Sequence, residues 1–244
     1  MKVSACICVY NETTLLKAAL KQYPEWVDRI IVLVSQMPWR GSGTADAFKT
    51  IELLRGWKDK RVEMVVNNWR NEEDQRNFGL GILADNDWVI TMDADEYFTK
   101  EGWDELHDSM REWGACDVIV AGMRTYWKSA DYRWEPPDMH KPTIAVRPKR
   151  TSFFDKREVT ANLNRQMRST MHHFSWVRTD EEVFQKVQNY MHADDFQGME
   201  WYGNIWKAWS EDKAKEMTNL RPYGDTTTKA IYDPAPQEIK DLFQ

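Results

Sequence analysis

Short apolar runs alternate with amphipathic segments along the first hundred residues. The runs are rich in Val and Ile and span residues 3–9, 30–34, 62–66 and 88–92, which is typical of strands buried on both faces. Between them apolar residues recur with helical spacing, and Asn71 is placed to cap the third helix. Four strands separated by three helices predict an α/β fold, with a doubly wound, mostly parallel sheet and helices on both faces.

The middle of the chain carries a weaker pattern. Thr99 can cap a helix that ends near Trp113, and residues 118–121 form one more apolar run. Residues 124–170 are aromatic, contain proline and show no strong periodicity, so we predict irregular structure there.

The last third returns to helical signals. Residues 179–182 have the form of a capping box and predict a helix that continues to Tyr190. We expect another helix over residues 199–217. The organisation predicted is a first half over residues 1–98, a second half of the same domain over residues 99–218, and an extended tail over residues 219–244, packed on the domain or partly mobile.

Length and composition favour one large globular domain. Of the 244 residues, 42% are hydrophobic and 30% are charged, and no apolar stretch reaches the roughly 18 residues that a membrane span needs. The first apolar run lacks a cleavage site, so we interpret it as a strand rather than a signal peptide. The three cysteines make no disulfide framework; we expect Cys6 and Cys8 to be small core residues, and the compartment to be the reducing cytoplasm.

The net charge of −6 disfavours a general nucleic-acid coat. Residues 147–168 are positively charged although the whole chain is negative: they contain seven basic side chains and only two acidic ones. This stretch is either a solvated basic face or a surface for phosphate or an acidic acceptor. The chain has thirteen tryptophans. We interpret them either as core residues or as contacts for ligands that have one apolar face, such as sugars.

Polar side chains follow the predicted strands, and they should converge at the carboxyl edge of the sheet, where open α/β folds bind ligands. The densest cluster follows the fourth strand and contains Asp93 and Asp95. Carboxylates at this spacing can share a hard cation, so we predict a site for Mn²⁺ or Mg²⁺. We expect His173 to complete the coordination, with His172 as a neighbour and His192 at a helix end.

Three ordered segments resemble family 2 glycosyltransferases with the GT-A fold. They are residues 8–12 (CVYNE), 75–80 (QRNFGL) and 87–96 (DWVITMDADE), and residues 173–176 (HFSW) resemble the metal-binding histidine segment of such enzymes. The resemblance implies a nucleotide-sugar donor, a metal bound by a DXD motif and transfer with inversion. It implies that Tyr10 and Glu12 line the nucleoside pocket, that Arg76 lies near the diphosphate and that Ala94 lies against the ribose. It also implies that the metal is bound by Asp93, Asp95 and His173, so that residues 1–98 bind the nucleotide-sugar and residues 99–218 supply the acceptor side and the histidine. From their positions at the strand ends we further expect Val9, Asn11 and Ser35 at the donor. Where many members have an acidic residue that reads the base, this chain has residues 35–39 (SQMPW), so the donor base is left open.

Inversion requires a carboxylate that takes the proton of the acceptor hydroxyl. We predict that Asp155 or Glu158 is this base, with Glu96 and Glu135 as alternatives. Aromatic faces stack on sugar rings, and the candidates for an acceptor platform are Trp127, Tyr132 and Trp134.

Other classes fit the pattern less well. A phosphatase of the haloacid dehalogenase type carries its two aspartates after the first strand, and a nucleotidyltransferase carries a Gly-rich basic loop there. A non-catalytic carbohydrate-binding protein would explain the tryptophans but needs no acids at the strand ends. We therefore expect a metal-dependent glycosyltransferase acting on a glycan or another hydroxyl acceptor; a modified nucleic-acid base is a less favoured acceptor.

Overall fold

The computed structural model describes residues 1–39, 47–189, 198–222 and 227–244. Up to residue 113 the elements are β1 (Val3–Val9), α1 (Thr14–Lys21), β2 (Arg29–Ser35), α2 (Phe48–Arg55), β3 (Val62–Asn67), α3 (Glu72–Ile82), β4 (Trp88–Ile90), β5 (Glu96–Tyr97) and α4 (Lys100–Glu112). Six strands follow: β6 (Val118–Trp127), β7 (Ser129–Glu135), β8 (Thr143–Val146), β9 (Phe153–Asp155), β10 (Glu158–Val159) and β11 (Asn164–Trp176). The last elements are α5 (Asp180–Asn189), α6 (Gly198–Trp201), the π-helical turn η1 (Tyr202–Trp206), the 3₁₀ turn η2 (Glu211–Lys213), β12 (Lys229–Tyr232) and α7 (Gln237–Asp241).

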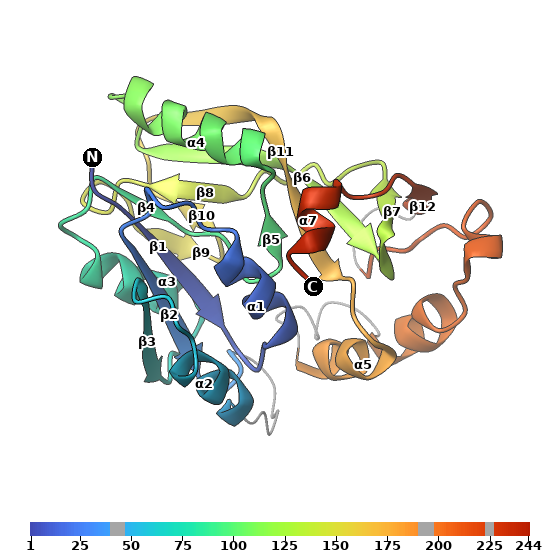
Figure 1. Cartoon of the computed structure of the whole chain (residues 1–244). Helices are drawn as coiled ribbons and strands as arrows, with labels where there is room; N and C mark the ends of the chain where they lie inside the picture. The colour runs from blue at the N-terminus through green and yellow to red at the C-terminus, as the bar shows by residue number, and fades with distance from the viewer. Residues whose placement is uncertain (40–46, 190–197, 223–226) are drawn as a thin grey trace.

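A central sheet connects both halves of the chain (Figure 1). Its strand order is β12-β7-β6-β8-β4-β1-β2-β3, with β11 beside β6 and β5 beside β11. Strands β3, β2, β1 and β4 are all parallel to one another, whereas β8 runs antiparallel to both β4 and β6. The predicted α/β fold with a doubly wound parallel sheet is therefore confirmed, and antiparallel strands extend it on the β4 side.

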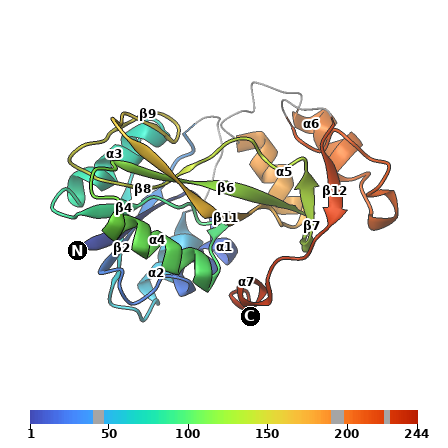
Figure 2. The same ribbon diagram turned by 90° about the horizontal axis from the view of Figure 1, so that it is seen from above.

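Helices cover both faces of this sheet, as predicted. Alternate β1 residues such as Ile7 and Val9 pack with α1, α2 and α4, whereas Cys6 and Cys8 on the other face pack with Leu80 of α3. Figure 2 shows α3 on the side of the sheet opposite these three helices. Both cysteines are buried and are not joined by a disulfide, so their expected role as small core residues is confirmed.

The predicted helix caps are formed. The side chain of Asn71 accepts a hydrogen bond from the Asp74 amide at 2.8 Å, and that of Thr99 accepts one from the Gly102 amide at 3.2 Å. At α5 the Thr179 amide donates to the Glu182 carboxylate at 2.8 Å while the Glu182 amide donates to the Thr179 hydroxyl at 3.3 Å. This reciprocal pair is the capping box that the sequence predicted.

Two expectations for the second half were wrong. Residues 124–170 are not irregular: they contain the end of β6, all of β7 to β10 and half of β11. The alternation that marks a strand is missing from β7 because six of its seven residues are neither fully buried nor exposed. Residues 199–217 form no single helix, because α6 gives way to the π-helical turn η1 and then to η2. A spacing of five residues lets Trp201 and Trp206 turn toward the same core cluster, which suits the wider π turn.

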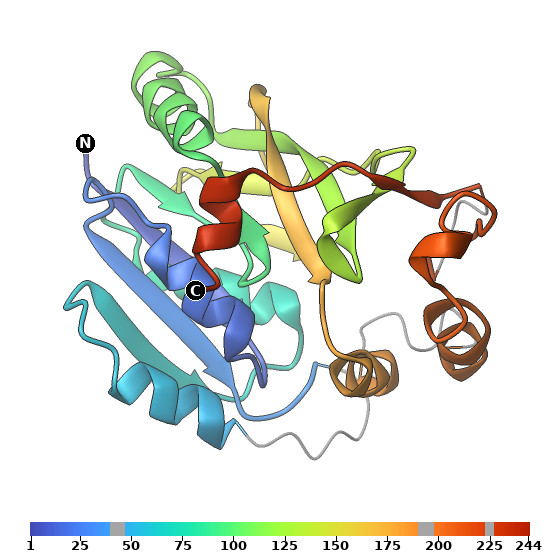
Figure 3. The same cartoon turned by 45° about the vertical axis from the view of Figure 1, so that its right-hand side comes forward.

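In the tail, residues 227–244 pack over the domain but are not simply extended. Strand β12 pairs antiparallel with β7, and α7 places Ile239 against Leu15 and Ala19 of α1. Figure 3 shows α7 beside α1. In the part of the chain that the structure describes, every helix is too short or too polar to cross a bilayer.

Candidate active site at the carboxyl edge of the sheet

Strand register brings the acidic cluster and the predicted histidine together. Strand β5 pairs antiparallel with β11, and this pairing sets His173 opposite Glu96. The amide of Phe174 also donates to the carbonyl oxygen of Asp95 at 2.7 Å. Residues 77 to 79 positions apart in the sequence therefore meet across one strand pair (Figure 1).

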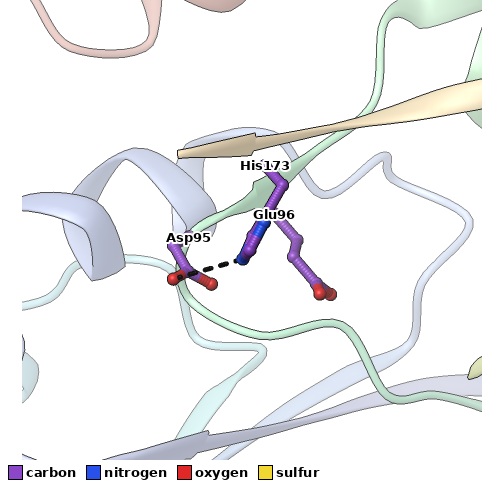
Figure 4. A group of neighbouring side chains, drawn as sticks. All are labelled: Asp95, Glu96 and His173. Atoms are coloured by element: carbon purple, nitrogen blue, oxygen red, sulfur yellow. Dashed lines mark ion pairs between the residues drawn. The ribbon is translucent and has the colours of Figure 1, made fainter. Parts of the chain in front are cut away.

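Asp95, Glu96 and His173 form a group that could hold a metal ion. One ligand atom from each residue lies within 4.8 Å of the others, and His173 Nε2 lies 3.7 Å from Asp95 Oδ2. In Figure 4 the carboxylates of Asp95 and Glu96 lie on either side of the imidazole. The side chains of Asp95 and His173 keep exposed fractions of 15% and 18%, so they are shielded but open to a ligand.

The surroundings of Asp95 and His173 lower the pKa values of both side chains. Burial alone would raise the pKa of Asp95, but His173, Lys186 and Arg178 together with a hydrogen bond from Ser175 lower this pKa to about 2. Burial lowers the pKa of His173, against the attraction of Asp95. Asp95 is therefore ionised and His173 neutral near pH 7, which are the forms that bind metals.

The second nitrogen of the His173 ring has its own partner. Strand β11 runs parallel to β6 with His173 beside Thr125, and the Thr125 hydroxyl lies 3.1 Å from His173 Nδ1. A hydrogen bond at Nδ1 orients the ring so that Nε2 faces Asp95. His172 turns to the other face of β11, where its Nδ1 lies 2.9 Å from the hydroxyl of Tyr126.

Asp93 is held by two arginines. Its Oδ1 accepts from Arg76 Nη2 at 2.7 Å, and its Oδ2 lies 3.2 Å from Arg157 Nη1. The Arg76 side chain is 2% exposed and also binds Glu72, so Arg76 and the predicted acid meet inside the protein. Contact between Arg76 and a diphosphate stays a prediction.

The residues that we expected at the donor lie at strand ends along the same edge of the sheet as the acidic cluster. Glu12 caps α1 by accepting from the Leu15 amide at 3.0 Å, and its other oxygen lies 2.6 Å from Arg178 Nη1. Val9 and Ala94 are buried, Tyr10 is half-buried, and Asn11 is exposed with φ 47°. The Ser35 hydroxyl is buried and donates to the Met37 carbonyl at 2.6 Å. None of these contacts tests nucleotide binding, which stays a prediction.

The hairpin of β9 and β10 carries the predicted bases, Asp155 and Glu158, and both are exposed. Asn77 of α3 holds this hairpin by pairing with the backbone of Phe153: the Phe153 amide donates to Asn77 Oδ1 at 2.9 Å and Asn77 Nδ2 donates to the Phe153 carbonyl at 2.8 Å. The neighbours Arg76 and Asn77 thus position Asp93 and the hairpin, respectively.

The proposed acceptor platform is mostly core. Trp127 on β6 is 0% exposed and Trp134 on β7 is 4% exposed, and both belong to a buried cluster that is rich in tryptophan. Tyr132 is partly exposed. Glu135 pairs with Arg133 on its own strand. His192 lies outside the described residues.

Three charged residues at the site were missed by sequence reasoning as functional residues: Arg157, Arg178 and Lys186. Lys186 had a usable signal, because it falls on the same helical face as Val183 and Val187, the buried residues of α5. A lysine on an apolar face is unusual without a partner. Its ammonium group donates to the Ser175 carbonyl at 3.2 Å, and burial and Arg178 lower its pKa to about 8.

Comparison with protein families agrees with this geometry. The model described as glycosyl transferase family 2 matches residues 4–184, well over half of the 244 residues. The chain belongs to glycosyltransferase family 2. The matched span contains the end of β1, the Arg76 helix, the acidic cluster and His173, which are the segments that carried the resemblance in the sequence.

The family 2 chain resembles several curated proteins over part of its length. It is 30% identical over 105 residues to an uncharacterized glycosyltransferase of Rickettsia conorii, covering 43% of this chain and 33% of that protein. An uncharacterized glycosyltransferase of Rickettsia felis matches at 30% over 43% of this chain and 32% of its own length. The chain thus spans about a third of the length of these relatives. Among solved structures, a 4-diphosphocytidyl-2C-methyl-D-erythritol synthase from Anaerococcus prevotii matches 76% of this chain and 95% of its own, with 13% identity and a TM-score of 0.43.

Proposed function

We propose that this glycosyltransferase moves a sugar from a nucleoside diphosphate donor to an acceptor hydroxyl, with a divalent cation and with inversion at the sugar carbon. The observation that carries the proposal is the approach of His173 to Asp95 across the β5–β11 pair, at the edge of the sheet where α/β folds bind ligands. A histidine and a carboxylate from distant segments have no structural need to meet at such an edge.

The residues fit Mn²⁺ or Mg²⁺. Two carboxylates and one imidazole nitrogen within 4.8 Å are a donor set that suits Mn²⁺ well and Mg²⁺ acceptably. Asp95, Glu96 and His173 would hold the ion, with Asp93 beside it. A bound ion would neutralise charge that develops on the departing diphosphate.

The strand ends that surround these ligands would hold the donor. Residues 9–12, at and just beyond the end of β1, and Ser35 at the end of β2 lie on the same edge as Ala94, which supports a nucleoside pocket there. Arg76 would act on this pocket through Asp93, because its guanidinium group is buried against that carboxylate.

The hairpin of β9 and β10 would form the acceptor side. Asp155 and Glu158 are exposed on it, while Arg157 between them reaches the Asp93 carboxylate. One of these two acids would accept the proton of the attacking hydroxyl of a glycan or another acceptor.

A panel of nucleotide-sugars with Mn²⁺, scored by release of nucleoside diphosphate, tests the proposal. We expect one donor to be turned over, and Asp95→Asn to lower kcat/KM by on the order of a hundredfold or more because the ion loses a ligand. Asp108→Asn is a matched control, since Asp108 is exposed on α4. Its kcat/KM should equal that of the wild type.

The proposal fails if no nucleotide-sugar in the panel is turned over or bound in the presence of Mn²⁺. It also fails if Asp95→Asn behaves like the control. In that case the acids at the strand end would serve folding alone.

A further inference from the structure

Asp138 lies in a gap along strand β6. Strand β11 pairs along the whole length of β6 on one edge, so the other strands use the opposite edge. On that edge β8 pairs with residues 118–120 and β7 with residues 126–127. Between these two pairings Met123 forms an isolated antiparallel bridge with Asp138. The loop that joins β7 to β8 therefore lies against β6 at this position.

The bridge sets the Asp138 side chain on the same face of the sheet as the imidazole of His173. Residues directly opposite each other in a strand pair share a face, and so do residues two apart on one strand. Asp138 thus faces the same way as Met123 and Thr125, and the Thr125 hydroxyl lies 3.1 Å from His173 Nδ1. The pairing of β6 with β11 has no register shift from Met123 to Thr125, so this alternation is unbroken.

Asp138 is near His173 but is not one of the candidate metal ligands. The two residues flank β6 and are two residues apart along the strands, which separates their Cα atoms by about 12 Å. Burial lowers the pKa of His173, whereas Asp95 and, more weakly, Asp138 act to raise it. The group whose ligand atoms lie within 4.8 Å of one another contains Asp95, Glu96 and His173 and does not contain Asp138.

Transfer with inversion requires a base at such a place. The attacking hydroxyl approaches the sugar carbon from the side opposite to the departing diphosphate. The group that takes its proton must therefore lie beyond the sugar, away from the metal that the diphosphate binds. An acid that shares the face of the metal ligands and is not itself a ligand meets this requirement.

The carboxylate of Asp138 has one oxygen held and the other free. Its Oδ1 lies 3.8 Å from Arg221 Nη1 and accepts a hydrogen bond from the His140 amide at 3.3 Å. Within the described residues no hydrogen bond or ion pair engages Oδ2, and this atom is not buried. The side chain is 21% exposed. The contacts of Oδ1 thus orient the group, while Oδ2 can accept a proton.

Arg221 brings the tail of the chain to this acid. Its Nη2 donates to the carbonyl oxygen of Pro136 at 3.3 Å, and its guanidinium group lies 5.3 Å from the centre of the Trp134 ring. The side chain is 12% exposed. Arg221 lies beyond residues 4–184, which match the family. A residue outside the matched span therefore fixes both the loop and the carboxylate of Asp138.

Asp155 and Glu158 are oriented less well. Both side chains are exposed on the β9–β10 hairpin. In the part of the chain that the structure describes, neither carboxylate has a hydrogen-bond or ion-pair partner. No neighbouring residue therefore fixes either group toward the metal site.

We propose that Asp138 is the catalytic base of the sugar transfer and that Arg221 is a positioning residue that orients it. Asp138 Oδ2 takes the proton of the acceptor hydroxyl while the oxygen of this hydroxyl bonds to the sugar carbon. The bond from that carbon to the diphosphate oxygen breaks, and its electron pair leaves with the diphosphate. The inference rests on the proposed transfer, in which Asp138 then takes the role given above to the hairpin acids.

Turnover of the donor found in the nucleotide-sugar panel tests the inference, with Mn²⁺ present and water as the acceptor hydroxyl. Asp138→Asn should lower kcat by about a hundredfold to ten-thousandfold, because an amide cannot take the proton. Its binding of Mn²⁺ and donor should be unchanged, since the role of Asp138 is toward the acceptor. Asp108→Asn, on an exposed aspartate of α4, is the matched control and should keep the wild-type kcat. Asp155→Asn and Glu158→Gln test the other candidates and should each lose far less than Asp138→Asn.

Sodium azide separates the loss of a base from a loss of structure. Azide is an anionic nucleophile with no proton to remove, so it should restore release of nucleoside diphosphate in Asp138→Asn and yield a glycosyl azide. If Asp138→Asn does not fold, Asp138→Glu keeps the charge that faces Arg221 and should lower kcat with water by about a hundredfold, because its carboxylate is misplaced.

The same assay tests Arg221. Arg221→Gln should lower kcat with water by about tenfold to a hundredfold, because the base is no longer oriented. Azide should restore turnover here too, since a misplaced base matters only for a nucleophile that carries a proton. Arg221→Lys keeps the charge and should retain more of the activity with water. Arg165→Gln, on an exposed residue of β11, is the matched control and should behave as the wild type.

Two results would refute the role of Asp138 while leaving the proposed function intact. One is a wild-type kcat in Asp138→Asn, or a larger loss in Asp155→Asn or Glu158→Gln. The other is a folded Asp138→Asn that binds Mn²⁺ and donor but does not respond to azide. Equal losses with water and azide in Arg221→Gln would refute its positioning role. By contrast, a wild type that turns over no donor would refute the proposed transfer itself.

Discussion

Gly79 packs helix α3 tightly against β1 and β2 of the central sheet, and replacing it with alanine should destabilise the protein. A Cβ atom at this position would overlap the Sγ atom of Cys6 on β1 and lie 3.1 Å from Cδ1 of Leu33 on β2. Cys6 is 3% and Leu33 0% exposed, so neither side chain has space into which it can turn. Relief requires α3 to move away from the sheet.

The magnitude follows from two opposing terms. Overpacking of a tight core costs about 1–3 kcal/mol, and the upper end applies where backbone must shift. Alanine in a helix gains about 1 kcal/mol over glycine. We therefore expect Gly79→Ala to lower the free energy of unfolding by about 1–2 kcal/mol.

Gly81 supplies the matched control on the same helix. A Cβ there meets nothing within 4 Å and the residue is exposed, so Gly81→Ala should raise the free energy of unfolding by up to about 1 kcal/mol. Equilibrium unfolding in urea measures both variants. Adding Cys6→Ala to Gly79→Ala should recover part of the loss, because it removes the overlapping sulfur.

A Gly79→Ala variant that is as stable as Gly81→Ala would refute the reasoning. The same would follow if Cys6→Ala and Gly79→Ala were simply additive, since a shared clash must give a coupling term. Because α3 also places Arg76 on Asp93, we further expect Gly79→Ala to weaken Mn²⁺-dependent turnover.

Three further outcomes follow from buried side chains. Burial lowers the pKa of His172 from 6.5 to about 4. Between these two pH values the unfolded chain binds more protons than the folded chain, so the free energy of unfolding decreases as the pH falls. It should be about 3 kcal/mol lower at pH 4 than above pH 6.5. Urea titrations of wild type and His172→Gln should differ in pH slope in that window, and equal slopes would contradict the prediction. Thr125→Val should weaken Mn²⁺ binding by about tenfold to a hundredfold, because His173 Nδ1 loses its partner, while Thr125→Ser should not. Trp127→Ala should cost about 3–5 kcal/mol in urea unfolding, because its fully buried ring packs on five other tryptophans; a loss below about 1 kcal/mol would mean that this cluster is loosely packed.

The parallel half of the fold was predictable because local signals and long-range packing agree there. Strands buried on both faces must be apolar throughout, so β1 and β2 are visible as continuous runs of Val, Ile and small residues. The caps at Asn71 and Thr99 depend on neighbours within three residues. Such features need no knowledge of the rest of the chain.

The antiparallel half was not predictable in the same way. Strand β11 is exposed at its beginning and buried at its end, because it leaves the edge of the sheet and enters between β5 and β6. No single period describes such a strand. Its pairing also passes through a register shift between Gln166 and Thr170, which local sequence does not encode in any simple way.

The residues of the site also differ in this way: local sequence predicts some of their features, and partners distant in the sequence decide the others. Asp93 and Asp95 were predictable as a pair from their place after a buried strand, but their partners were not: Asp93 pairs with Arg157, 64 residues away in the sequence, and Asp95 lies beside His173. Neighbouring acids look alike in a sequence, and only their partners distinguish them. The hairpin of β9 and β10 supplies that distinction because Asn77 holds it beside the strand end. The hairpin of β9 and β10 therefore brings a positive charge to the acidic cluster, because Arg157 on this hairpin pairs with both Asp93 and Glu96.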